Sequence, residues 1–249
     1  MKTARSVVIT GANGGIGQAL CALFQENGWS VIATDLHPLA KASCDRYVSA
    51  DLLKVSNDSS YRDDRLRQLR ACLPDSWKLD VLINNAARQV VAPVEQLTAS
   101  DWQDTYNVNV TAPFLLVQGL LKELESSRGM VINIASVHAY LTKPQFVAYA
   151  TSKAALVGFT RALAVELGGR VRVNAVCPAA VSTPMLLAGF EGNEEGLAKL
   201  AAYHPSQCIG TPEDIAGVAL ALASSFSTYM SGAIINVDGG IGSRLYDPA

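Results

Sequence analysis

The chain has 249 residues, of which 49% are hydrophobic and 17% charged, and its formal net charge is −2. This balance suits one large, well-buried domain and argues against a nucleic-acid partner, since such proteins usually carry a basic face. No run reaches the roughly 18 apolar residues that a membrane span needs, so no membrane partner is expected.

Short apolar runs alternate with segments of helical period along the chain. This alternation is typical of βαβ units, whose right-handed crossovers place helices on both faces of a parallel sheet. The predicted fold is a single α/β domain of the doubly wound Rossmann type over residues 1–249, with a seven-stranded, mostly parallel sheet. Strands are predicted at 6–10, 30–34, 46–50, 80–84, 130–135, 171–176 and 233–237, and helices at 15–27, 59–73, 110–126, 147–168 and 212–224.

The first predicted strand begins at residue 6, which leaves no room for a secretory signal peptide. The five cysteines are scattered and form no C-x-x-C pair, so no metal site is expected. Free thiols of this kind are typical of a reducing compartment, and a cytoplasmic location is predicted.

A glycine-rich turn follows the first strand, where residues 10–17 read TGANGGIG and lead into a helix. Glycines allow a sharp turn and a close backbone approach, and the helix start offers unpaired N–H groups to a pyrophosphate. The turn between a first strand and a helix therefore predicts a dinucleotide site.

The second strand leads into Asp35, whose carboxylate suits the adenosine ribose hydroxyls and repels a 2′-phosphate. Leu36 offers apolar surface to adenine, and neither Leu36 nor Asn13 supplies the cation that an NADP site favours. The cofactor is therefore predicted to be NAD, with a strand-end cap as the other interpretation of Asp35.

Tyr149 and Lys153 are four residues apart in a predicted helix, so they share one face. A nearby ammonium favours the phenolate, so the pKa of Tyr149 is expected to lie below its usual value. That shift would suit a tyrosine that exchanges a proton near neutral pH. Ser136 comes just after the strand predicted at 130–135, at the edge where ligands of such sheets bind.

Taken in order, these motifs resemble the short-chain dehydrogenase/reductase family over nearly the whole chain. The resemblance implies that Tyr149 exchanges the substrate proton, that Ser136 positions the substrate oxygen, and that Lys153 holds the nicotinamide ribose. It implies that Asn109 ties Lys153 to a water relay. The matching segments are TGANGGIG at 10–17, NNAA at 84–87, Asn109, Ser136, YATSK at 149–153, NAVCP at 174–178 and VDGG at 237–240.

The resemblance also implies a set of residues along the dinucleotide. Two of its positions depart from the family, which usually has glycine where this chain has Ala87 and Ala179. Either alanine would be strained if its site needs a positive φ. The implied cofactor residues are Gly11, Asn13, Gly15, Ile16, Gly17, Asp35, Leu36, Asp51, Leu52, Asn85, Ala86, Ala87, Val108, Tyr149, Lys153, Pro178, Val181 and Thr183.

For the substrate, two stretches resemble the 3-hydroxybutyrate dehydrogenase subgroup, in which a polar cluster holds the carboxylate. Gln89 and His138 match two members of that cluster, although ordinary loop polarity explains them equally well. Phe146 replaces a lysine of the subgroup, which predicts a less anionic or bulkier substrate. Arg88 is a second candidate cation whose direction the sequence leaves open. Segment 184–210, rich in Gly and Pro, is predicted to form a lid over the substrate.

The main hypothesis is an NAD-dependent dehydrogenase acting on a small or medium secondary alcohol or ketone. The alternatives are an NADPH-dependent ketoacyl-type reductase and a non-catalytic dinucleotide-sensing protein. Surplus apolar residues in helices 110–126 and 147–168, together with the resemblance, predict a homotetramer.

Overall fold

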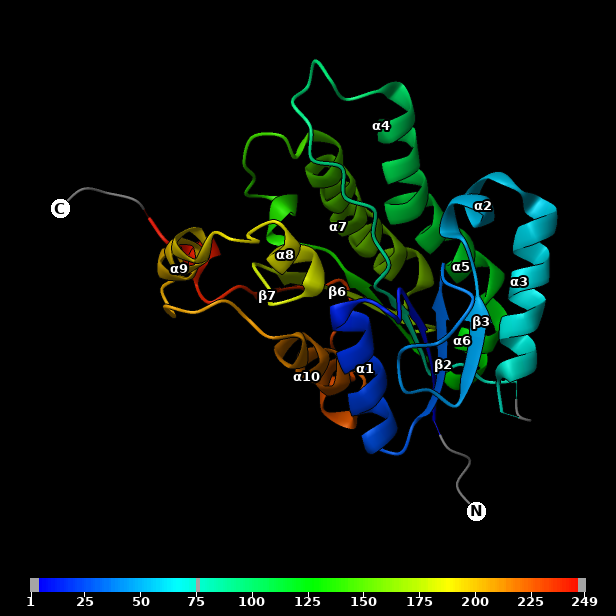
Figure 1. The fold of residues 1–249 in the computed structure, drawn as a ribbon. Coiled ribbons are helices and arrows are strands. Elements are labelled where there is room, and N and C mark those ends of the chain that lie inside the picture. Colours follow the sequence, from blue (N-terminus) through cyan, green and yellow to red (C-terminus); the bar gives the residue numbers. More distant parts are fainter. Residues whose placement is uncertain (1–4, 75–76, 246–249) are drawn as a thin grey trace.

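A computed structural model describes residues 5–74 and 77–245 of the chain (Figure 1). It contains one seven-stranded sheet with the order β3-β2-β1-β4-β5-β6-β7, and all six strand pairings are parallel. The fold prediction is confirmed, and the sheet is entirely rather than mostly parallel. The strands are β1 (Ser6–Thr10), β2 (Ser30–Asp35), β3 (Arg46–Ser49), β4 (Val81–Asn84), β5 (Met130–Ile134), β6 (Arg172–Pro178) and β7 (Ile234–Val237).

Helices cover both faces of this sheet, as Figure 1 shows. Successive side chains of a strand point to opposite faces, so Val7 and Ile9 of β1 pack in one cluster and Val8 in the other. The first cluster includes apolar side chains of α1 (Gly15–Glu26) and α10 (Pro212–Leu222), and these two helices contact each other. The second includes side chains of α3 (Ser59–Cys72), α5 (Ala112–Gly119), α6 (Leu121–Ser127) and α7 (Val147–Leu167). Burial on both faces explains why the strands read as continuous apolar runs.

The helix predicted at 110–126 is wrong as one element, because the structure divides it. A π-helical turn, η1 (Asn107–Thr111), leads into α5, and Leu120 separates α5 from α6. Pro113 has no N–H to donate within the helix, which weakens regular α-helical bonding where η1 meets α5. The other four predicted helices appear as α1, α3, α7 and α10 with small boundary shifts.

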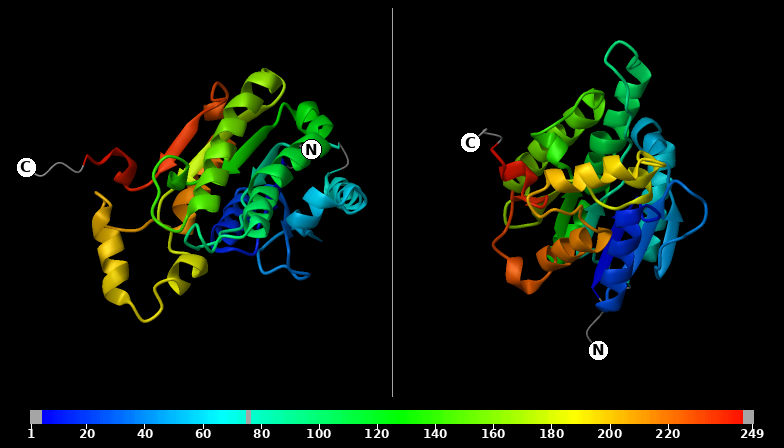
Figure 2. Two further views of the ribbon diagram at one scale, coloured as in Figure 1. Left: turned by 90° about the horizontal axis from the view of Figure 1, so that it is seen from above. Right: turned by 60° about the vertical axis from the view of Figure 1, so that its left-hand side comes forward.

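The structure also has short helices that apolar periodicity does not predict. Four of them begin at side-chain caps, because Asp51, Thr98, Thr183 and Asn193 each accept a backbone N–H of the first turn. α8 and α9 lie within 184–210 and form an arm that stands out from the rest of the domain in Figure 2. The added elements are α2 (Leu52–Asn57), α4 (Ala99–Tyr106), α8 (Pro184–Ala188), α9 (Glu194–Tyr203), η2 (Val137–Ala139), η3 (Ser225–Ser227) and η4 (Ile241–Ser243).

Within the two described ranges, no helix has the length and apolar character required to cross a membrane.

Candidate active site

The turn after β1 is held tightly against the end of β4. The hydroxyl of Thr10 accepts the backbone N–H groups of Asn85 and Ala86, both at 3.0 Å. The side-chain amide of Asn85 donates in return to the carbonyls of Thr10 and Gly11, at 2.9 and 3.0 Å. These four bonds fix the glycine-rich turn beside the ends of the central strands.

Two glycines of this turn have no room for a side chain. Gly11 has φ +63°, and a Cβ there would lie 2.7 Å from the Cα of Ala86. A Cβ on Gly17 would overlap the carbonyl oxygen of Gly11. Gly14 caps α1 without a side-chain acceptor, so the first N–H groups of that helix are available to an anion. This cradle fits the pyrophosphate of a dinucleotide, and Gly15 and Ile16 form the start of α1 beside it.

Asp35 acts as a cap at the end of β2. Its carboxylate accepts the backbone N–H of Asn13 at 3.0 Å and that of His37 at 3.3 Å, so it does cap local N–H groups. The Asn13 side chain binds the loop after β2, accepting the N–H of Lys41 at 2.7 Å and donating to the carbonyl of Leu39 at 3.0 Å. Leu36 is 63% exposed beside this carboxylate and forms an apolar surface.

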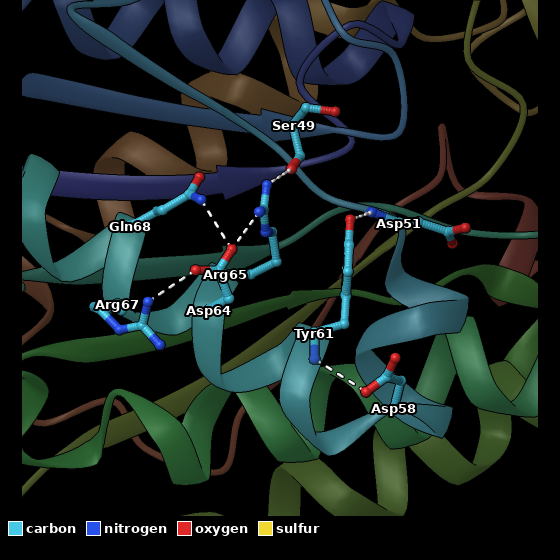
Figure 3. A network of polar contacts seen from close by, with 8 residues as sticks. All are labelled: Ser49, Asp51, Asp58, Tyr61, Asp64, Arg65, Arg67 and Gln68. Atoms are coloured by element: carbon cyan, nitrogen blue, oxygen red, sulfur yellow. Dashed lines mark hydrogen bonds and ion pairs between the residues drawn. The ribbon is translucent and has the colours of Figure 1, made fainter.

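Asp51 is held by a polar network on α3, which Figure 3 shows from close by. Its carboxylate caps α2 by accepting the N–H of Leu53 at 2.9 Å, and its own N–H donates to the hydroxyl of Tyr61 at 3.0 Å. Arg65 donates to the carbonyl of Ser49 at 3.0 Å, and its guanidinium lies 5.0 Å from the Tyr61 ring. Sequence analysis missed Tyr61 and Arg65. Leu52 is buried next to this network.

The predicted pair on α7 is brought together as its spacing requires. The ammonium of Lys153 lies 5.6 Å from the centroid of the Tyr149 ring and donates to the carbonyl of Ile134 at 2.7 Å. Lys153 is only 2% exposed. The side chain of Ser136 lies close to the Tyr149 hydroxyl and favours its ionised form, which lowers the pKa of Tyr149. Tyr149, Ser136 and Lys153 therefore meet at the end of β5.

The expected direction of the Tyr149 pKa is wrong. Burial raises the pKa of Tyr149 to about 12, and the side chain of Ser136 offsets this only in part. Burial also lowers the pKa of Lys153 to about 8. The Lys153 ammonium donates to the carbonyl of Ile134 rather than to the Tyr149 oxygen. The free-energy cost of desolvating a Tyr149 phenolate therefore exceeds the stabilisation that this ammonium gives it.

Asn109 lies in η1 and joins the loop after β4 to α7. Its side chain accepts the N–H of Arg88 at 2.7 Å and donates to the Arg88 carbonyl and to the hydroxyl of Ser152, both at 2.9 Å. This places it one residue from Lys153 along α7, although the bond of the Lys153 ammonium goes to Ile134. The Arg88 guanidinium forms an ion pair with Asp101 of α4 at 3.3 Å, so a carboxylate of α4 neutralises its positive charge. Val108 lies beside Asn109 in the same turn.

The two alanines that replace glycine are unstrained. Among the described residues, the non-glycine positions with positive φ are Trp77, Arg128, Gln145 and Gln207. Ala87 and Ala179 thus have ordinary backbones, and each adds a methyl group without left-handed strain.

The residues after β6 continue the same edge of the sheet. Pro178 ends β6, and Val181 forms a bridge with Gly210. A Cβ on Gly15 would lie 2.9 Å from a methyl group of Thr183, so Thr183 lies against the glycine-rich turn. Thr183 therefore places the start of the arm beside that turn, and the bridge between Val181 and Gly210 joins the two ends of the arm.

Two of the three candidate substrate residues lie beside Tyr149. The rings of His138 and Phe146 are stacked with centroids 4.6 Å apart, and each presents an edge-to-face arrangement to Tyr149, at 5.8 and 6.1 Å. Burial, with a smaller contribution from the charge of Lys143, lowers the pKa of His138 to about 4. Gln89 is exposed on the loop after β4, and within the described part of the chain no hydrogen bond or ring contact joins it to these rings.

Comparison with known proteins gives consistent matches. The family model described as enoyl-(acyl carrier protein) reductase matches residues 11–242. The 3-oxoacyl-[acyl-carrier-protein] reductase FabG of Thermotoga maritima is 35% identical, over 94% of this chain and 96% of its own.

Two solved structures have similar folds. One from Beutenbergia cavernae, named as an NAD(P)-dependent gluconate 5-dehydrogenase with bound NADP, is 32% identical, with a TM-score of 0.85 and 98% of both chains covered. A 4-hydroxyisoleucine dehydrogenase complexed with NADH is 28% identical, with a TM-score of 0.86, covering 97% of this chain and 100% of that one.

Proposed function

The chain belongs to the short-chain dehydrogenase/reductase family and is an oxidoreductase of that family, and we propose that it uses NAD(H) to interconvert a small or medium secondary alcohol and its ketone. The observation that carries this proposal is the meeting of Tyr149, Ser136 and Lys153 at the end of β5, at the same edge of the parallel sheet as the glycine-rich turn.

In the proposed reaction, the residues of this chain handle the proton and the substrate oxygen. With a pKa raised to about 12, Tyr149 is a neutral phenol at neutral pH and donates its proton to a carbonyl oxygen during reduction. The hydroxyl of Ser136 binds that oxygen and orients it toward Tyr149. The buried Lys153 ammonium places positive charge beside the phenol as it loses its proton. The nicotinamide, when bound, supplies or accepts the hydride.

The preference for NAD over NADP is part of the proposal. Asp35 is held by two backbone N–H groups, so its carboxylate stays where it would repel a 2′-phosphate. The side chain of Asn13 is engaged with the loop after β2, and Leu36 is apolar. This position therefore lacks the basic group that favours NADP.

The substrate is proposed to be a carbonyl compound that binds beside an aromatic wall formed by the rings of Phe146 and His138. Phe146 and His138 line the approach to Tyr149, and the arm at 184–210 is proposed to close over the substrate as a lid. We expect 3-hydroxybutyrate to be a poor substrate and longer or less charged relatives to react faster. Phe146→Lys should shift the preference toward the short acid.

An NADPH-dependent ketoacyl-type reductase is the second candidate function, and the 35% identity to a 3-oxoacyl-[acyl-carrier-protein] reductase favours it. A dinucleotide-sensing protein without catalysis is a third, which the complete set of Tyr149, Ser136, Lys153 and Asn109 disfavours.

A homotetramer is proposed, and fewer exposed apolar residues support it than the sequence suggests. Three of the apolar residues that looked surplus, Val117, Leu120 and Leu156, are buried in the chain's own core. Phe114 and Val165 remain exposed, the latter at 85%, and offer an apolar surface for a second copy. A cytoplasmic location is also proposed, since all five cysteines are free.

The proposed function is tested by titrating the protein with NADH and NADPH, followed by an alcohol and ketone panel with each cofactor. We expect tighter binding of NADH and NADH-dependent reduction of neutral methyl ketones. Equal or tighter binding of NADPH contradicts the cofactor assignment. Binding without turnover of any compound contradicts the proposed activity and favours the sensing protein.

A further inference from the structure

The loop between β5 and α7 brings a cation to the aromatic wall of the site. The ammonium of Lys143 lies 4.6 Å from the centroid of the Phe146 ring. Phe146 stacks on His138 at 4.6 Å, and both rings contact Tyr149 edge to face. Phe146 stands where the 3-hydroxybutyrate dehydrogenase subgroup has a lysine, but this region still carries a positive charge. Lys143, three positions earlier in the chain, supplies it.

No carboxylate of the described residues pairs with this cation. The ion pairs of the structure involve Arg65, Arg67, Arg70, Arg88, Arg170 and Lys199. Lys143 is exposed, and its ammonium makes a cation–π contact with the Phe146 ring. Such a contact stabilises by only about 0.5–1 kcal/mol at an exposed site. An anion can therefore compete for the ammonium with little loss, and solvent access lets it enter.

The neighbouring groups suit a carboxylate. His138 is neutral at neutral pH, because burial and the Lys143 charge lower its pKa to about 4. Its Nδ1 faces the hydroxyl of Thr142 at 3.2 Å. Lys143 is thus the cation of this corner, while Thr142 and the imidazole supply neutral hydrogen-bonding groups.

We infer that Lys143, with Thr142 and His138, forms a subsite for the carboxylate of an oxo or hydroxy acid longer than 3-hydroxybutyrate. The inference rests on the proposed function and specifies its substrate class. Tyr149 and the Lys143 ammonium share the Phe146 ring as a neighbour, whose centroid is 6.1 Å from that of Tyr149 and 4.6 Å from Nζ. A molecule that reaches both groups crosses an apolar ring, so methylene groups separate its carbonyl from its carboxylate.

The test uses three oxo acids of increasing length, acetoacetate, 4-oxopentanoate and 5-oxohexanoate, each paired with its methyl ester. The ester keeps the carbon frame and removes the charge. NADH oxidation gives kcat/KM for all six compounds in the unmodified protein. We expect the acid to be preferred over its ester by about tenfold for 4-oxopentanoate or 5-oxohexanoate, as one charge-assisted contact provides, and no preference for acetoacetate over its ester.

Three variants locate the effect. Lys143→Met should bring the acid-to-ester ratio of the longer compounds close to one, through a higher KM for the acids. Lys143→Arg should keep the preference. Lys122→Met removes an exposed lysine on α6 and serves as the charge control, with all ratios expected to equal those of the unmodified protein.

The outcomes separate the two proposals. Reduction of the esters with no preference for any acid, or a preference that survives in Lys143→Met, overturns the subsite and leaves the dehydrogenase assignment intact. Absence of NADH-dependent reduction for the six compounds and for neutral methyl ketones overturns the proposed function and the subsite with it.

Discussion

The network behind Asp51 allows a quantitative prediction about cofactor affinity. Tyr61→Phe removes only the hydroxyl that accepts the Asp51 N–H at 3.0 Å and keeps the ring beside Arg65 (Figure 3). A neutral hydrogen bond of this kind contributes about 0.5–1.5 kcal/mol net. Asp51 is half-buried, so water replaces part of the lost bond, and a cost of about 1 kcal/mol is expected.

That cost corresponds to a roughly fivefold loss of affinity if the bond positions Asp51 for the adenine end of the cofactor. The Kd of NADH, from its fluorescence, and that of ADP-ribose, from competition, should rise by the same factor. kcat at saturating NADH should stay unchanged, because the Tyr61 hydroxyl bonds Asp51 and takes no part in the proton transfer proposed for Tyr149. Arg67→Ala is the matched control on α3, since its side chain is 73% exposed and its pair with Asp64 contributes little.

Unchanged affinity for both ligands in Tyr61→Phe, together with a loss of unfolding free energy, would show that the network only stabilises the fold. Loss of NADH affinity with normal ADP-ribose affinity would also refute the reasoning, because the effect would then come from the nicotinamide end.

Three further predictions concern stability, selectivity and assembly. Burial lowers the pKa of Lys153 from 10.5 to about 8, so the unfolded chain binds more protons between these values and the Lys153 contribution to stability rises with pH there. The free energy of unfolding in urea should rise for the unmodified protein relative to Lys153→Met between pH 8 and pH 10. A difference between the two free energies that stays constant over this range contradicts the lowered pKa of the buried Lys153 ammonium. Asp35→Ala should weaken NADH binding more than NADPH binding, and equal weakening in the same titration argues against its role in selectivity. Light scattering should give a tetramer at micromolar concentration and a smaller species for Val165→Glu at unchanged melting temperature, whereas a monomer for the unmodified protein rules the assembly out.

The sheet was predictable because its strands are buried on both faces, which leaves continuous apolar runs such as those of β1 and β5. The short helices were not, because α2 and α8 have only one or two turns and show no apolar period. Their caps, Asp51 and Thr183, were the available signal. Pro113 was the signal for the divided helix.

Within the site, spacing predicted that Tyr149 and Lys153 share a face, because a helix has a fixed period. The direction of the Tyr149 pKa depends on burial, which only the packed structure defines. The place of Lys143 depends on a loop in which Gln145 has φ +74° and its carbonyl accepts the N–H of Ala92 at 3.1 Å. This hydrogen bond joins segments that are distant in sequence, so no local sequence pattern predicts the position of Lys143.

The most direct test of the central claim is the turnover of Tyr149→Phe with NADH and a ketone that the unmodified protein reduces. The variant keeps the ring between Phe146, His138 and Lys153 and loses only the hydroxyl that moves the proton. We predict a loss in kcat of about 10²–10⁴-fold with an unchanged Kd for NADH. Near-normal turnover of that variant would contradict the assignment of Tyr149 as the proton donor.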